Sequence, residues 1–210
     1  MFLGFRALLA LFPAVAEQWE NNLAVFNEID SEFGDGDHGV TIGKIAARLR
    51  AAAGEVAERP LREVFDDLSM AIMGVGGGAA GPLYGTLFSG LGEGLEPDAV
   101  TVDADQLKAM LKASRAALAS ITKAQVGDKT MMDALLPAVA AAEACTGDIP
   151  EILRAADEAA NEGAEATAGM VSKFGRARSY GDRTIGTPDA GAKSTALLFH
   201  GLFLGLNTAE

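Results

Sequence analysis

The chain has 210 residues, a formal net charge of −12 and a single cysteine. This length is enough for one domain with a sizeable core. The negative charge argues against a nucleic-acid partner, because phosphate backbones attract basic surfaces. One cysteine, Cys145, excludes an internal disulfide and suits a reducing compartment, so we expect a cytoplasmic protein.

The composition favours packed helices, because apolar residues make up 49% of the chain and aromatics only 6%. The first helix is expected over residues 3–29, with a kink at Pro13. Its apolar positions recur at steps of three and four. They are Leu8, Phe12, Val15, Trp19, Leu23 and Phe26. A signal peptide ending at Ala16 is the alternative, but Arg6 follows the apolar residues instead of preceding them.

The rest of the chain predicts seven more helices and no strand. Asp103 or Asp105 is expected to cap the fifth helix, and Asp128 or Thr130 the sixth. No other apolar run approaches the ~20 residues of a membrane-spanning helix. We therefore expect a single all-α domain over residues 1–210, with no membrane partner. The further helices are expected at 40–57, 61–73, from 82 onward, up to 121, up to 144, 150–174 and 193–206.

An acidic loop, residues 30–39, contains three aspartates within eight positions. Asp35 and Asp37 flank one glycine, and Asp30 ends the preceding helix, so all three carboxylates can reach one point. Such carboxylates repel one another unless a cation neutralises them, and hard oxygen ligands suit Mg²⁺. A solvated Asp/Gly turn is the structural alternative. An EF-hand is disfavoured, because the alternating ligands and the terminal glutamate are missing.

A glycine-rich loop, residues 74–81, precedes a helix expected to start near Pro82. Free N–H groups and the helix dipole make such a junction an anion site, although a flexible connection would have the same composition. Near the C-terminus, Lys193 and Ser194 resemble the end of a P-loop, but the glycine spacing and the preceding strand are missing. We expect Ser194 and Thr195 in the first turn of the last helix.

A long loop, residues 175–191, contains Arg176, Arg178 and Arg183 beside two aspartates. Arginines on a mobile loop could stabilise phosphoryl charge. An ion-paired surface loop is the simpler interpretation.

Four segments in order resemble the nucleotide-binding (L) domain of dihydroxyacetone kinases over almost the whole chain. They are Asp30 to Gly39, Gly74 to Thr86, Gly127 to Met131 with Asp133 to Pro137, and Gly175 to Gly186. The resemblance implies an antiparallel barrel of about eight helices. It also implies an ADP/ATP site with two Mg²⁺ ions, held by Asp30, Asp35 and Asp37.

The resemblance also implies roles for individual nucleotide contacts. Arg178 would be the catalytic lid residue. The other expected contacts are His38, Thr41, Gly78, Ala79, Thr122, Met131 and Asp189. The chain departs from the family pattern at Ala80, where serine is frequent, at Thr122, which aligns with a glycine, and at Ala190, which replaces a proline. These changes affect nucleotide contacts and not the metal ligands.

The implied activity is that of one half of a ketose kinase. The ketose would be held by a separate dihydroxyacetone-binding K subunit, and the phosphoryl donor would be ATP or a phosphotransferase-system phosphocarrier protein. Alternatives are a kinase for erythrulose, the nucleotide domain of a fatty-acid kinase, a nucleotide-dependent regulatory module and a helical interaction protein. A homodimer is left open.

Overall fold

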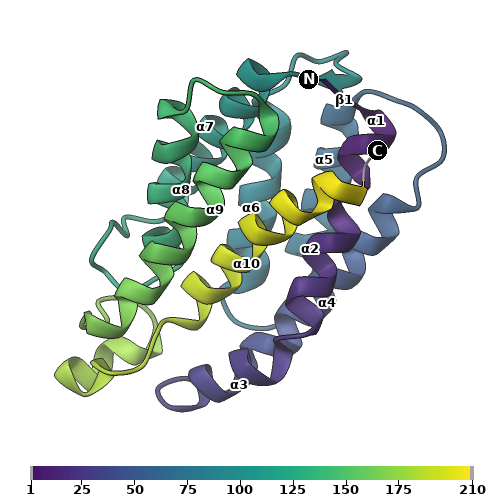
Figure 1. The fold of residues 1–210 in the computed structure, drawn as a ribbon. Helices are drawn as coiled ribbons and strands as arrows, with labels where there is room; N and C mark the ends of the chain where they lie inside the picture. Colours follow the sequence, from purple (N-terminus) through teal and green to yellow (C-terminus); the bar gives the residue numbers. More distant parts are fainter. Residues whose placement is uncertain (1, 209–210) are drawn as a thin grey trace.

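The computed structural model describes residues 2–208, which form a bundle of α-helices and begin and end toward its upper end (Figure 1). The expected all-α class is confirmed. Ten α-helices fall within the described range. They are α1 (Phe5–Leu9), α2 (Leu11–Glu20), α3 (Leu23–Ser31), α4 (His38–Ala53), α5 (Leu61–Met73), α6 (Ala80–Glu93), α7 (Ala104–Ile121), α8 (Met132–Ala144), α9 (Ile149–Ala166) and α10 (Ala190–Gly205).

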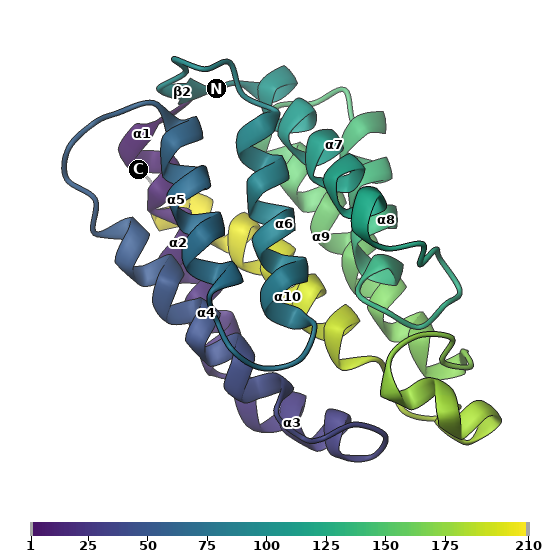
Figure 2. The same cartoon turned by 180° about the vertical axis from the view of Figure 1, so that it is seen from behind.

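Eight of these helices close a ring, in which each packs on the next. The order is α2, α4, α5, α6, α7, α8, α9 and α10, and α10 returns to pack on α2. Neighbours run antiparallel, as Figures 1 and 2 show from opposite sides. The interior is apolar, and Phe12 meets Phe65 and Phe88 edge to face at centroid distances of 6.1 and 6.3 Å.

The up-and-down order places every second connection at the same end of the ring. The connections α3–α4, α5–α6, α7–α8 and α9–α10 all lie in the half opposite the termini (Figures 1 and 2). Each of the four sequence segments singled out above lies in one of these connections or extends from it into a neighbouring helix. Helices that alternate in direction thereby bring together loops that are far apart in the sequence.

The N-terminal segment differs from the single helix expected over residues 3–29. It divides into α1, α2 and α3, with breaks at Ala10 and at Asn21 and Asn22. Pro13 lies in the first turn of α2, and the break at Ala10 lies three residues before it. Pro13 cannot donate to the Leu9 carbonyl, so the expected interruption of the helix occurs just before the proline. The apolar stripe is nevertheless buried, and Val15 and Trp19 are 0% exposed.

Several boundaries also differ from expectation. Two short strands, β1 (Leu3–Gly4) and β2 (Thr101–Val102), form an antiparallel pair that the sequence did not predict. α9 stops at Ala166, well before residue 174, and is followed by the 3₁₀ turns η1 (Thr167–Gly169) and, in the expected long loop, η2 (Arg176–Thr184). A third turn, η3 (Leu206–Thr208), follows α10.

The predicted helix starts are partly confirmed. Asp103 caps α7 in a capping box with Gln106, as expected. Asp128 does not cap α8, whose N-cap residue is Met131. The Thr130 hydroxyl oxygen accepts the N–H of Met132, the first residue of the helix, at 3.2 Å. The last helix starts at Ala190, so Ser194 and Thr195 lie in its second turn and not its first. Within residues 2–208, no helix combines the length and apolar character needed to cross a membrane.

Candidate metal and nucleotide site

The three aspartates of the acidic loop converge. One carboxylate oxygen from each of Asp30, Asp35 and Asp37 lies within 4.8 Å of the others. The loop curls back because Asp30 Oδ2 accepts hydrogen bonds from the backbone N–H groups of Gly36 at 2.8 Å and Asp37 at 3.1 Å. Gly36 has a φ of +72°, which glycine adopts without strain. The expected meeting of three carboxylates is therefore present in the fold.

The charge of this cluster is only partly balanced. Arg176 of η2 forms an ion pair with Asp35, and its hydrogen bond lowers the pKa of that carboxyl. Asp35 is exposed, while Asp30 and Asp37 are partly buried. The cluster contains three carboxylates and is paired with one guanidinium, so negative charge remains in excess. The charge lies on oxygen atoms, which are hard ligands. This donor set fits Mg²⁺, which takes a few carboxylates and completes its shell with water and phosphate oxygens.

The segment around η2 lies beside the acidic loop, and both lie at the lower end of the molecule (Figures 1 and 2). Besides the Arg176 ion pair, the Tyr180 ring lies 5.2 Å from the Phe33 ring. The hydroxyl of Thr187 donates to the Glu32 carboxylate. Arg178 is exposed on the same turn, and it does not reach the aspartates in this arrangement. We call residues 171–186 the lid segment.

The glycine-rich loop lies beside the first turn of α4. A Cβ on Gly77 would lie 2.3 Å from Thr41 Oγ1, so the loop backbone passes directly over that side chain. Gly77 and Gly78 have φ values of +128° and +49°. Lys44 Nζ also donates to the Gly76 carbonyl at 3.2 Å. The expected neighbours Thr41 and Gly78 are therefore close in space.

This loop leads into the N-terminus of α6, which starts at Ala80. Its N-cap residue, Ala79, has no side-chain acceptor for the N–H groups of the first turn. Gly78 and Ala79 are exposed. The N–H groups and the positive end of the helix dipole are suited to an anion such as phosphate.

His38 is held in place by a buried hydrogen-bond chain. Its Nε2 lies 2.9 Å from Ser194 Oγ, which lies 2.8 Å from the hydroxyl of Tyr84. The Tyr84 hydroxyl also lies 3.0 Å from Thr195 Oγ1. Burial lowers the pKa of His38 to about 4, so the ring is neutral near pH 7. The segment that resembled a P-loop therefore contributes to the fixed orientation of His38.

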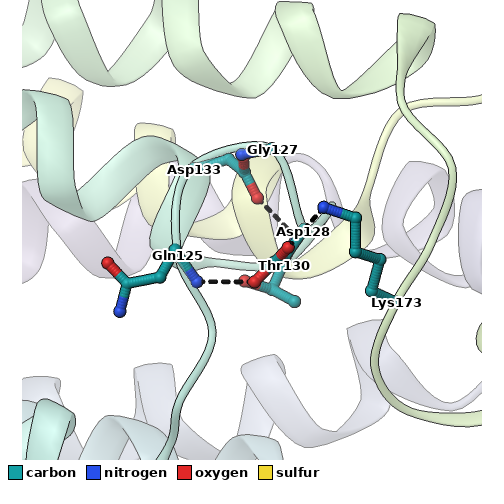
Figure 3. Close-up of polar contacts among 6 residues, drawn as sticks. All are labelled: Gln125, Gly127, Asp128, Thr130, Asp133 and Lys173. Atoms are coloured by element: carbon teal, nitrogen blue, oxygen red, sulfur yellow. Dashed lines mark hydrogen bonds and ion pairs between the residues drawn. The ribbon is translucent and has the colours of Figure 1, made fainter.

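The loop between α7 and α8 is organised by two aspartates (Figure 3). Asp133 is fully buried, and its two oxygens accept from the N–H groups of Gly127 at 2.6 Å and Thr130 at 2.7 Å. Asp128 accepts from the Gln125 N–H at 2.8 Å and from Lys173 Nζ at 2.7 Å. The hydrogen bonds of Asp133 shape the loop, and the bond between Asp128 and Lys173 connects the loop to the lid segment.

The chain matches the DAK2 domain family over residues 32–203. It belongs to this family. The chain is 33% identical over 188 residues to the ADP-binding subunit DhaL of a PEP-dependent dihydroxyacetone kinase of Listeria innocua, covering 89% of each chain. It is 37% identical to a D-erythrulose kinase of Mycolicibacterium smegmatis, covering 92% of this chain and 34% of that one.

A solved structure shares the fold of this DAK2 domain. It is the dihydroxyacetone kinase of C. freundii in complex with AMP-PNP and Mg²⁺, at a TM-score of 0.71 and 26% identity. The match covers 94% of this chain and 33% of that one, so the chain spans about a third of that kinase. The erythrulose kinase is likewise about three times longer than the matched region.

Three further expected contacts of the DAK2 domain lie in different surroundings. Met131 is buried, and a Cβ on Gly191 at the start of α10 would lie 3.5 Å from it. Asp189 caps α10 by accepting from the Ala192 N–H at 2.7 Å. Loss of hydration raises the pKa of Asp189 to about 7. Thr122 follows α7 and accepts from the N–H of Ala124 within its own turn, at 3.2 Å.

Two residues acquire importance only in the folded DAK2 domain. Arg176 contacts Asp35, whereas the sequence directed attention to Arg178. Lys129 is 4% exposed and lies beneath the lid segment. A lysine between Asp128 and Thr130 in a glycine-containing turn has the appearance of a surface residue. Neither periodicity nor local charge distinguished it.

Proposed function

We propose that this chain is the ADP/ATP–Mg²⁺-binding subunit of a small-ketose kinase of the dihydroxyacetone type. The observation that carries the proposal is the convergence of three carboxylates beside a glycine-rich helix start, at one end of the ring. A metal-binding group and an anion-binding group side by side suit a metal–nucleotide. The names of the relatives, an ADP-binding subunit and a kinase with AMP-PNP and Mg²⁺, support this choice.

In the proposed site, Asp30, Asp35 and Asp37 would hold two Mg²⁺ ions, whose charge would neutralise the terminal phosphates. The backbone at Gly78 and Ala79 would bind phosphate oxygens. Phosphoryl transfer depends mainly on positioning and charge stabilisation, which are what these groups supply.

The remaining contacts would surround the nucleotide. Met131 and Thr122 would lie near the adenine, and Asp189 near the ribose or the lid segment. His38, fixed in its neutral form through Ser194, would face the phosphates with Thr41 nearby. Arg178, exposed on the lid segment, would be the catalytic group that reaches the transferring phosphoryl group once the segment moves.

The acceptor would be dihydroxyacetone held on a separate K subunit, which makes this chain one half of the kinase. Residues 1–210 would form one nucleotide-binding domain of a cytoplasmic enzyme. Relatives named as PEP-dependent and PTS-dependent favour a phosphocarrier protein as the source of the phosphoryl group. Erythrulose is the second candidate acceptor, because a D-erythrulose kinase is 37% identical to this chain.

Native mass spectrometry of the purified protein tests the proposal, with and without a chelator and with added ATP. We expect a retained mass equal to ADP plus two Mg²⁺ ions, lost after chelation. Slow exchange of this nucleotide would favour recharging by a phosphocarrier, and fast exchange would favour direct use of ATP. Absence of nucleotide under every condition would refute the site.

Reconstitution with a K subunit identifies the acceptor. Dihydroxyacetone and both erythrulose enantiomers are compared with each phosphoryl donor, and the preferred acceptor is the one with the highest kcat/KM. If none of the three is phosphorylated while metal-dependent nucleotide binding is intact, the regulatory module becomes the better hypothesis.

A further inference from the structure

A buried ammonium group lies under the lid segment. Lys129 is 4% exposed, and it has a φ of +59°, a left-handed conformation that is uncommon for a residue with a side chain. Its backbone is held in the loop that Asp133 organises through Gly127 and Thr130. The neighbouring hydrogen bonds thus stabilise a backbone conformation that directs this side chain inward.

Four backbone carbonyls surround Lys129 Nζ. Those of Thr167 and Met170 lie at 2.9 and 3.2 Å, and those of Thr184 and Thr187 at 2.6 and 2.5 Å. The first two precede the lid segment, Thr184 lies near its end, and Thr187 directly follows it. An ammonium has three N–H donors, so the four carbonyls share them. One charged group therefore joins both ends of the lid segment.

Two backbone hydrogen bonds support the place where the two ends of the lid segment meet. We call this place, where residues 167–170 meet residues 184–187, the neck. The Gly186 N–H donates to the Ala168 carbonyl at 2.8 Å, and the Lys173 N–H donates to the Asp128 carbonyl at 3.1 Å. The Thr167 carbonyl also accepts the Met170 N–H at 3.0 Å. Loss of the ammonium would remove the lysine donor from the other three carbonyls, which is costly where they are buried. Closing the neck also limits the conformations open to the intervening residues.

The position of Lys129 links two parts of the proposed site. Thr130 and Met131 follow it directly in the chain, on the side where the adenine is proposed to lie. The segment whose neck it closes contains Arg176, which meets Asp35, and the exposed Arg178. A shift of the neck would move both arginines relative to the three aspartates.

We propose that Lys129 is a positioning residue that fixes the lid segment against the acidic loop by holding four backbone carbonyls where the two ends of the segment meet. This inference rests on the proposed function for its catalytic consequence. Its structural part, the fixed neck, does not depend on any bound nucleotide. The two parts can therefore be tested separately.

Hydrogen–deuterium exchange of the nucleotide-free protein tests the structural part. Lys129→Met gives an unbranched side chain that is one atom shorter and has no hydrogen-bond donor. We expect exchange of the amides in residues 171–187 to rise about tenfold or more, with α5 and α6 unchanged. The matched control is Lys173→Met, which removes an exposed ammonium of the same segment that pairs with Asp128, and we expect a much smaller effect.

Unchanged exchange in the lid segment of Lys129→Met would overturn the proposal. An even rise over the whole chain would also overturn it, because it would make Lys129 a general stabiliser. Lys129→Gln retains two N–H donors and is expected to give intermediate protection of residues 171–187. If Lys129→Met does not fold, this variant carries the test, and exchange equal to that of wild type would refute the role.

Kinetics of the kinase reconstituted with its K subunit test the catalytic part. For Lys129→Met we expect kcat to fall about tenfold or more, while the Kd for Mg·ADP changes less than about threefold. Equal losses in both would mean that Lys129 serves nucleotide binding and does not position the lid. If wild type itself binds no nucleotide, the proposed function fails, while the exchange result still decides the fixed neck.

Discussion

Two aspartate- and glycine-rich loops at the same end of the ring each use one carboxylate, Asp133 or Asp30, to hold their own backbone. Only the α3–α4 loop gathers further carboxylates beside it. In the α7–α8 loop, both oxygens of the buried Asp133 accept backbone N–H groups of the loop itself (Figure 3). In the α3–α4 loop, Asp35 is exposed and its partner is Arg176, a residue from far along the chain. A carboxylate whose oxygens accept N–H groups of the local backbone determines the shape of its loop. Carboxylates left available can bind a cation.

The largest expected effect comes from the available carboxylates. Replacing Asp35 and Asp37 together by alanine should weaken Mg·ADP binding by about 100-fold or more, because hard oxygen ligands are lost. The helical circular dichroism should stay unchanged. Isothermal titration calorimetry measures the affinity, with Asp182→Ala, an exposed aspartate of the lid segment, as the matched control. Unaltered affinity in the double variant would mean that the loop is only a turn.

Arg176 and Arg178 of the lid segment should differ in their effect on kinetics. Arg178→Ala is expected to lower kcat by about 100-fold, the usual scale for one charge-stabilising donor, with a smaller loss of nucleotide affinity. Arg176→Ala should free Asp35 and leave nucleotide-free Mg²⁺ affinity equal or higher. Steady-state kinetics and metal titrations of both variants measure this. Equal losses of kcat and affinity in Arg178→Ala would make it a binding residue.

Asp133, whose two oxygens both accept backbone N–H groups, should contribute to the free energy of unfolding. Asp133→Ala leaves the N–H groups of Gly127 and Thr130 without acceptors, at roughly 1–3 kcal/mol each, so we expect unfolding to become easier by about 2–4 kcal/mol. Asp128→Ala, whose ion-pair partner Lys173 is exposed, should cost no more than about 1 kcal/mol. Urea unfolding of both variants gives the comparison, and similar losses would contradict it.

The smallest effect is a pH dependence from His38. Its pKa is about 4 in the folded protein, lowered by burial from the ordinary histidine value of 6.5. Between these values the unfolded chain binds a proton that the folded protein does not. Stability of the nucleotide-free protein should therefore fall as pH drops from 6.5 toward 4, by at most ~1.4 kcal/mol per pH unit.

Urea unfolding at several pH values measures this dependence. His38→Asn removes the titrating group, so its stability should change less over the same range. A wild-type profile parallel to that of the variant would show that other groups dominate acid unfolding.

Much of the fold followed from the sequence because helix formation is local. Steps of three and four in the apolar residues, a capping aspartate at Asp103 and the prolines and glycines between helices identified most of the ring. The break at Asn21 and Asn22 was missed, because the apolar stripe continues through it. The end of α9 was missed as well, since the residues after Ala166 form turns stabilised by contacts from elsewhere, including Lys129.

The sequence by itself determined the helical class and the three aspartates, because their spacing around Gly36 brings them together locally. Only the tertiary structure decided which charged groups meet them or lie beneath the lid segment. Arg176 reaches Asp35 across more than a hundred residues, and Lys129 is buried by carbonyls contributed from residues 167–187. Contacts of that kind depend on the antiparallel order of the ring, which places distant connections at one end and leaves no local pattern.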